Sequence, residues 1–109
     1  DAATMWASLC KLMALDDETV IYCGHEYTAA NADFALSVDP DNEALMRRVM
    51  AVRDLRAAGQ PTIPTMLALE KITNPFLRAG DPAIRAHLGM SDADDVDVFA
   101  EIRRRKDSF

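Results

Sequence analysis

The chain has 109 residues, half of them hydrophobic, and a formal net charge of −6 at pH 7. This length fits one modest domain, and the negative charge argues against nucleic acid or an anionic membrane as partner unless basic residues cluster locally. Cys10 and Cys23 fit a reducing compartment better than a disulfide scaffold. We expect no signal peptide and no membrane span, because no run approaches the ~20 apolar residues that a span requires, and therefore a cytoplasmic protein.

The start of the chain predicts a helix followed by a strand. Asp1 can cap a helix that begins at Ala2. Its broad apolar face predicts burial against a sheet or another helix. This face consists of Met5, Trp6, Leu9, Cys10, Leu12, Met13 and Leu15. Residues 19–23 are β-branched and apolar and predict a short buried strand. An isolated buried strand leaves backbone groups unpaired, so we expect the end of a larger sheet-containing domain here.

The segment Gly24-His25-Glu26-Tyr27-Thr28 follows the predicted strand, at the point where apolar residues take up helical spacing. In α/β proteins, metal and ligand sites collect at the carboxyl ends of strands. A neutral imidazole at this position can bind a metal ion, which makes His25 a candidate ligand. The alternative is an ordinary hydrogen-bonded turn histidine, because no metal motif surrounds it.

The middle of the chain predicts two further helices and a long irregular stretch. One helix is expected from Tyr27 to about Val38, and Asp39-Pro40 predicts the cap and first turn of the next. That second helix presents one apolar face and ends at Gly59. The face consists of Leu45, Val49, Val52 and Leu55. Residues 60–78 contain three prolines and predict an irregular stretch, with a helical turn near 66–70.

Two helices are predicted in the last third of the chain. Asp81-Pro82 opens a short helix that ends at Gly89 and carries His87 in its last turn. The final helix runs from about 94 to 106, with acidic residues first and four consecutive basic residues last, which complements the helix dipole. Arg103 and Lys106 are three apart on one face and could clamp a carboxylate. The alternative reading of this basic run is a solvated helix end.

Three motifs occur together: Gly24-His25-Glu26-Tyr27-Thr28, residues 74–78 (Asn-Pro-Phe-Leu-Arg) and residues 102–107 (Ile-Arg-Arg-Arg-Lys-Asp). In this order and spacing they resemble the C-terminal part of glyoxalase II, the hydroxyacylglutathione hydrolase family of the metallo-β-lactamase superfamily. The resemblance implies a mainly α fold of about five helices plus one strand. Residues 1–25 would then close a metallo-β-lactamase-like domain, as a helix and the last strand of its α/β fold, and residues 26–109 would form a helical substrate-binding domain.

The family resemblance also implies an activity and site residues. The family hydrolyses S-D-lactoylglutathione to glutathione and D-lactate, with two divalent metal ions activating a bridging water. By position, His25 matches a metal ligand, and Tyr27 and Phe34 match residues that line the glutathione site. Arg103 and Lys106 match a basic pair that holds a carboxylate of the tripeptide. The segment 74–76 is expected to be a packing element without a catalytic role.

The sequence also departs from this family. The His-x-His-x-Asp-His motif that supplies most metal ligands is absent, and Cys10, Cys23 and His87 are the other candidate donors besides His25. We therefore expect a C-terminal portion that is inactive alone and binds metal poorly. For the two metal ions of the full-length family we expect zinc first, and iron or manganese also suit such sites. The expected partners are a glutathione thioester and the missing N-terminal domain. We expect the full-length protein to be a monomer.

Two alternatives to this interpretation stay open. The chain could be an independent helical module that binds an anionic peptide or protein through residues 103–106, without catalysis. It could also be a helical bundle with no ligand, in which His25 and Tyr27 are buried or satisfied by backbone groups.

Overall fold

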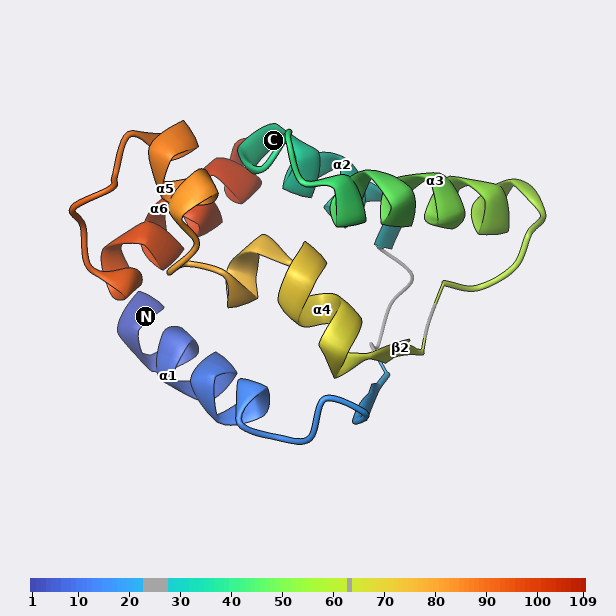
Figure 1. Cartoon of the computed structure of the whole chain (residues 1–109), viewed down its shortest axis with the longest axis horizontal. Helices are drawn as coiled ribbons and strands as arrows, with labels where there is room; N and C mark the ends of the chain where they lie inside the picture. Colours follow the sequence, from blue (N-terminus) through green and yellow to red (C-terminus); the bar gives the residue numbers. More distant parts are fainter. Residues whose placement is uncertain (23–27, 63) are drawn as a thin grey trace.

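The computed structural model describes residues 1–22, 28–62 and 64–109 (Figure 1). The described part contains six α-helices, one 3-10 helix and one two-stranded antiparallel sheet. The elements are α1 (Ala2–Met13), β1 (Val20–Ile21), α2 (Thr28–Val38), α3 (Glu43–Ala57), β2 (Thr65–Met66), α4 (Leu67–Thr73), the 3-10 helix η1 (Pro75–Leu77), α5 (Pro82–Leu88) and α6 (Asp95–Asp107). The predicted mainly helical class is confirmed, with one helix and one strand more than expected. None of these described helices is long and apolar enough to cross a membrane.

Helix α1 packs on the C-terminal helix of the chain. It begins as predicted, since Asp1 Oδ1 accepts a hydrogen bond from Thr4 N at 2.8 Å. The Trp6 ring lies 5.6 Å from the Phe99 ring of α6. The apolar face is therefore covered by another helix, but incompletely, because Met5 stays 45% exposed.

The strand predicted at residues 19–23 differs from expectation. Its described part is the two-residue β1, in which Val20 pairs with Met66 and Ile21 pairs with Thr65 of β2. The prediction of a buried strand is wrong at Val20, whose side chain is 51% exposed. The partner strand lies inside the stretch expected to be irregular, and α4 and η1 follow it there.

Helix α3 begins at Glu43 rather than at Pro40, so the predicted start is wrong. Asn42 is the cap, and its Oδ1 accepts a hydrogen bond from Leu45 N at 3.1 Å. The rest of the prediction for this helix agrees with the structure, since three of the four residues on the predicted apolar face are buried. These three are Leu45, Val49 and Val52. Gly59 follows the helix with φ +72°, a left-handed conformation that suits glycine.

Two groups of buried residues hold the helices together. The larger joins α2, α5 and α6 and contains Phe34, Val38, Ala79, Ile84, Leu88, Val98, Phe99 and Ile102. The smaller joins α2 and α3 and contains Ala32, Ala35, Leu45 and Val49. Helix α2 contributes to both groups and therefore connects α3 to α6, as its position between them in Figure 1 shows.

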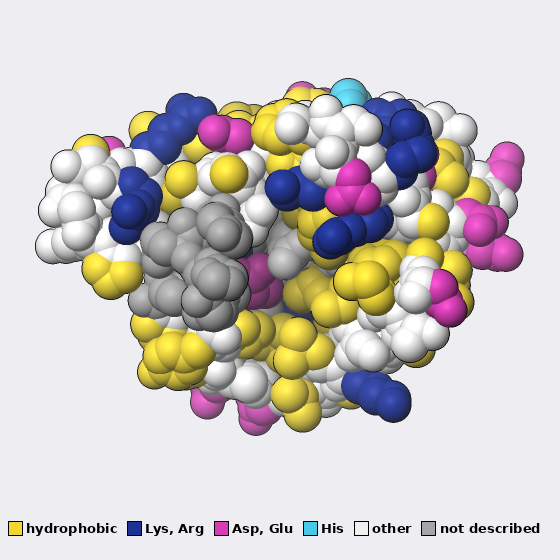
Figure 2. All heavy atoms as spheres, turned by 180° about the vertical axis from the view of Figure 1, so that it is seen from behind, with side chains coloured by type: hydrophobic (Ala, Val, Ile, Leu, Met, Phe, Trp, Pro, Cys, Tyr) yellow, Lys and Arg dark blue, Asp and Glu magenta, His cyan; other side chains and the backbone are white. Residues whose placement is uncertain are grey.

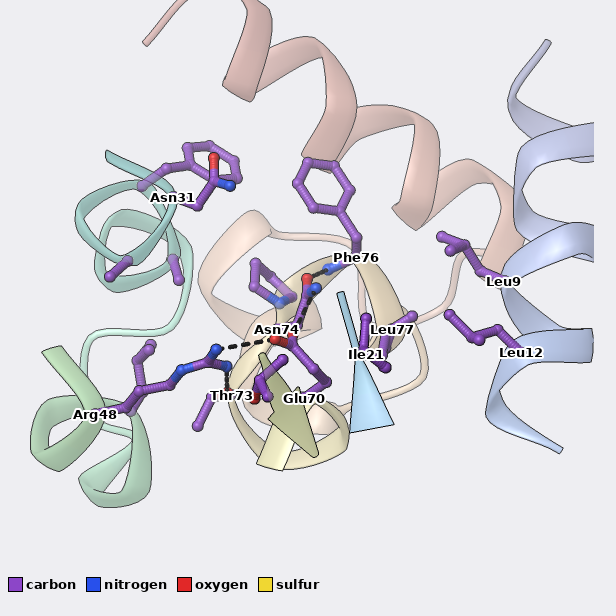
Figure 3. A pocket seen from close by; sticks show the side chains of 16 residues that line it. Leu9, Leu12, Ile21, Asn31, Arg48, Glu70, Thr73, Asn74, Phe76 and Leu77 are labelled. Atoms are coloured by element: carbon purple, nitrogen blue, oxygen red, sulfur yellow. Dashed lines mark hydrogen bonds and ion pairs between the residues drawn. The ribbon is translucent and has the colours of Figure 1, made fainter. Parts of the chain in front are cut away.

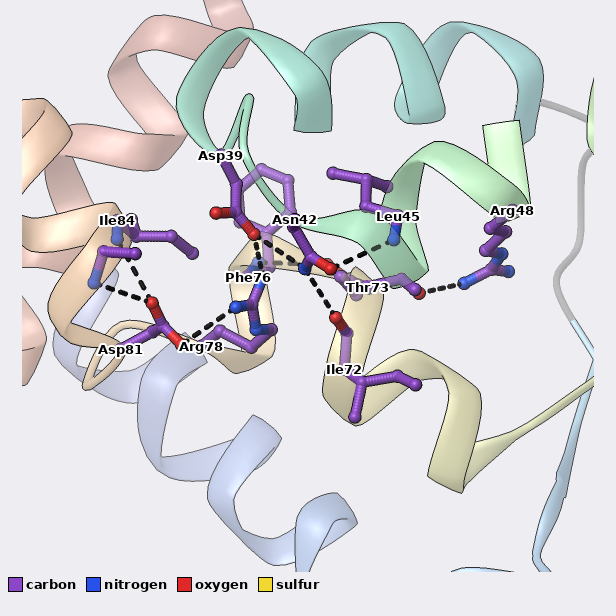
Figure 4. A network of polar contacts seen from close by, with 12 residues as sticks. Asp39, Asn42, Leu45, Arg48, Ile72, Thr73, Phe76, Arg78, Asp81 and Ile84 are labelled. Atoms are coloured by element: carbon purple, nitrogen blue, oxygen red, sulfur yellow. Dashed lines mark hydrogen bonds and ion pairs between the residues drawn. The ribbon is translucent and has the colours of Figure 1, made fainter. Parts of the chain in front are cut away.

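A polar network joins the ends of four helices (Figure 4). Arg78 donates hydrogen bonds to Asp39, after α2, and to Asp81 at 2.9 Å. Asn42 Nδ2 donates to Asp39 at 2.9 Å and to the Ile72 carbonyl in α4 at 2.8 Å. Asp81 also caps α5, as its position before a proline predicted. The network thus fixes the end of α2 relative to the starts of α3 and α5 and the end of α4.

Candidate functional site

Two of the four consecutive basic residues at the end of α6 form ion pairs with an acidic residue of the same helix. Arg104 Nε donates to Glu101 Oε1 at 2.7 Å, and Arg105 Nε donates to Glu101 Oε2 at 3.0 Å. The hydrogen bonds from Arg104 and Arg105 lower the pKa of the Glu101 carboxyl from 4.5 to about 2. Glu101 therefore stays ionised and holds two of the four consecutive cations.

Arg103 and Lys106 are the two basic residues of this run that Glu101 does not hold. Arg103 Nε lies 3.5 Å from Asp107 Oδ1, and both side chains are more than half exposed, so this contact is weak. Lys106 is partly exposed and forms no ion pair with any residue in the described ranges. Apart from the weak contact with Asp107, the predicted pair forms no ion pair with the described residues.

The surface of the molecule shows basic and apolar side chains close together. Figure 2 shows a group of Lys and Arg side chains on one face, with an acidic side chain among them. Hydrophobic side chains gather directly below this group. This face therefore combines positive charge with apolar surface.

Phe34, predicted to line a substrate site, lies in the core of the structure. Its side chain is 1% exposed. Its ring stacks on Phe76 of η1 with centroids 5.9 Å apart and meets Phe109 edge-on at 5.5 Å. Phe76 in turn meets Phe99 of α6 edge-on at 5.9 Å. Aromatic neighbours from η1 and the end of the chain therefore enclose the Phe34 ring.

The segment 74–76 packs between helices, as the sequence predicted, and Arg78 extends its contacts. Asn74 Oδ1 accepts a hydrogen bond from Phe76 N at 2.9 Å, which caps η1. Asn74 Nδ2 donates to Glu70 Oε2 at 3.0 Å and ties η1 to α4. Phe76 then fills the space between α2 and α6, and Arg78 anchors the segment to the polar network. This motif therefore sets the distance between the helix that carries Phe34 and the helix that carries the basic pair.

A cavity of about 200 Å³ lies between α1, α2, α3 and α4, with Phe34 and Phe76 in its wall (Figure 3). Its polar side is an ion pair between Arg48 Nη2 and Glu70 Oε1 at 2.9 Å. Arg48 Nη1 also donates to Thr73 Oγ1 at 2.7 Å. These charges are largely buried and already paired, so the cavity offers mainly apolar surface.

The metal-ligand predictions fall partly outside the described residues. The candidate ligands His25 and Cys23 belong to the segment 23–27 that the structure does not describe, as does Tyr27, which was predicted to line the glutathione site. His87 Nε2 lies 3.0 Å from a backbone carbonyl of α2, and Cys10 is an exposed free cysteine. Within residues 1–22, 28–62 and 64–109, no three His, Cys, Asp or Glu side chains gather closely enough to hold a metal ion.

Sequence reasoning missed two residues that shape this region. Glu101 could have been found, because its spacing of three and four from Arg104 and Arg105 is that of helical ion pairs. Phe109 was missed because its contact with Phe34 joins segments far apart in the sequence.

Comparisons with known proteins give one family. Residues 26–109 match the family described as hydroxyacylglutathione hydrolase C-terminus. The chain is 64% identical over 107 residues to a hydroxyacylglutathione hydrolase of Maricaulis maris, and 62% identical over 108 residues to one of Rhizobium meliloti. These alignments cover 98% and 99% of this chain, but 42% of each relative. The chain therefore spans about two fifths of the length of these curated relatives.

Proposed function

Since the chain belongs to the hydroxyacylglutathione hydrolase C-terminus family, we propose that it is the substrate-binding C-terminal portion of a cytoplasmic glyoxalase II-type thioesterase. The longer enzyme hydrolyses S-D-lactoylglutathione to glutathione and D-lactate in this proposal. Residues 1–25 close the preceding metallo-β-lactamase-like domain, and residues 26–109 form the helical domain. The match to the family, which begins at residue 26, supports this division.

The arrangement at the end of α6 carries the proposal. Glu101 holds Arg104 and Arg105, whereas Arg103 and Lys106 keep donors for a ligand. A guanidinium fork and an ammonium on one helix face suit a carboxylate, and glutathione carries carboxylates at its ends. A local basic pair of this kind also explains how an acidic protein binds an anionic tripeptide.

The proposed metal chemistry needs residues beyond the described ones. The family resemblance implies two divalent metal ions, zinc first and iron or manganese as alternatives, with His25 as one ligand. When bound, the metals supply a hydroxide nucleophile at neutral pH. The described residues alone contain no group of three His, Cys, Asp or Glu side chains that could hold a metal ion. In our proposal the other ligands come from the part of the longer relatives that this chain does not span.

The role of this chain is then to bind and orient the glutathione part of the thioester. Arg103 and Lys106 hold the carboxylate, and Tyr27 donates a hydrogen bond while its ring packs on the tripeptide. Phe34 supports the site from α2. Orientation of this kind lowers the barrier because the scissile carbonyl reaches the nucleophile without a further entropic cost.

A chimera tests this function. The C-terminal 42% of the Maricaulis maris relative is replaced by this chain, and hydrolysis of S-D-lactoylglutathione is followed with zinc, iron or manganese added. We expect the chimera to be active and the chain alone to be inactive with every metal. A folded chimera without turnover would contradict the proposal, and turnover by the isolated chain would contradict its predicted inactivity.

Two variants of the chimera test the role of the basic pair. Arg103→Ala should raise KM for the thioester by about tenfold or more, because it removes a charge-assisted contact. Arg104→Ala removes the same charge from a side chain that Glu101 holds, and it should leave KM within about twofold. Binding of acidic peptides without binding of glutathione would instead favour the independent helical module.

A further inference from the structure

The residue after the last turn of α6 gives this site an aromatic surface that the sequence did not predict. We propose that Phe109 contacts the bound glutathione and provides the aromatic lining of the glutathione site that the family resemblance implied for Phe34. This inference rests on the proposed function and deepens it. Phe109 is 66% exposed, although its ring meets that of Phe34 in a T-shaped arrangement with the centroids 5.5 Å apart.

Phe109 follows the basic pair in the sequence, one turn after Lys106. Its backbone N–H donates to the Lys106 carbonyl at 3.2 Å, and Ser108 between them keeps a helical conformation. The chain thus continues its turn past Asp107, where α6 ends. Residues three apart in such a turn lie on the same side. Lys106 is three residues from both Arg103 and Phe109, so it neighbours each of them at the end of α6.

The burial of Phe34 favours Phe109 as the residue that meets the ligand. A side chain that is 1% exposed offers a ligand almost no contact area, and Phe34 is packed against Phe76 as well as Phe109. Phe109, by contrast, is two-thirds exposed. A ligand whose carboxylate is held by Arg103 and Lys106 can lay its methylene groups on an exposed ring nearby. Phe34 then acts as the support on which the Phe109 ring rests.

The test is an NMR titration of this chain with glutathione, with the signals of Phe109, Arg103 and Lys106 followed. We expect saturation transfer between the Phe109 ring protons and the glutathione methylene protons, which a purely structural role would not produce. Phe109→Ala should weaken binding three- to tenfold, and Phe109→Tyr should restore it. Met50, on α3, has the same exposed fraction of 66%, so Met50→Ala is the matched control and should leave the affinity unchanged.

The outcomes separate this inference from the proposed function. Glutathione-dependent shifts at Arg103 and Lys106, with no transfer from Phe109 and unchanged affinity in Phe109→Ala, would overturn the role of Phe109 while leaving the basic pair. A folded chain whose Arg103 and Lys106 signals do not respond to glutathione would overturn the proposed binding role, and the inference with it.

Discussion

Arg78 and Asp39 form an ion pair whose side chains are 13% and 4% exposed. The pair joins the segment after η1 to the end of α2, and Asn42 adds a hydrogen bond to the same carboxylate. Burial raises the cost of leaving either charge alone, so the two residues depend on each other. The pair holds η1 in place. Because Phe76 of η1 packs between α2 and α6, the pair also helps to set the spacing of these two helices.

Removing the guanidinium should destabilise the fold strongly. Arg78→Ala leaves Asp39 buried without its cationic partner, and we expect the free energy of unfolding to fall by about 3 kcal/mol. Arg53→Ala breaks an ion pair whose side chains are 64% and 52% exposed, and should cost less than about 1 kcal/mol. Urea unfolding of the two variants checks this difference. Equal losses would show that the buried pair has no special weight.

The two contacting aromatic residues should differ sharply in their effect on stability. Phe34→Leu reshapes a fully buried position and should lower the free energy of unfolding by about 1–2 kcal/mol. Phe109→Ala removes a ring that is 66% exposed and should cost less than about 1 kcal/mol. Thermal and urea unfolding measure both. A loss for Phe109→Ala as large as that for Phe34→Leu would place Phe109 in the core instead of at the ligand surface.

Glu101 should make stability depend on acid pH. Its pKa is about 2 in the folded chain, against 4.5 for an unperturbed group. A lowered folded pKa contributes stability that is complete above the unfolded value and is lost as the pH falls through the folded value. The advantage of the wild type over Glu101→Gln, about 1 kcal/mol for surface helix pairs, should therefore shrink between pH 4.5 and 2. Urea unfolding across this range measures it, and a constant difference would exclude this role.

Local signals in the sequence predicted several helix boundaries correctly. Asp81 before a proline caps α5, and Gly89 ends it with φ +71°. Asp1 caps α1 in the same direct way. Each of these signals acts within a few residues of the boundary that it sets, which is why the sequence alone reveals it.

Contacts between distant segments account for the predictions that failed. Asp39 looked like a helix cap, but its carboxylate pairs with Arg78, and Asn42 caps α3 instead. The strand pairing of Val20 with Met66 likewise depends on where β2 lies in space. At the site, motif and helical spacing indicated Arg103 and Lys106. The structure adds that Glu101 forms ion pairs with Arg104 and Arg105 and not with Arg103 or Lys106.

The most direct test of the central claim is the dissociation constant of glutathione for this chain and two of its variants. Arg103→Ala should weaken binding by about tenfold or more, because it removes one half of the basic pair that we propose holds the carboxylate. Arg104→Ala should change the constant by less than about twofold, because Glu101 already holds that guanidinium. Equal effects of the two substitutions, or no effect of Arg103→Ala, would contradict the assignment of this pair to glutathione.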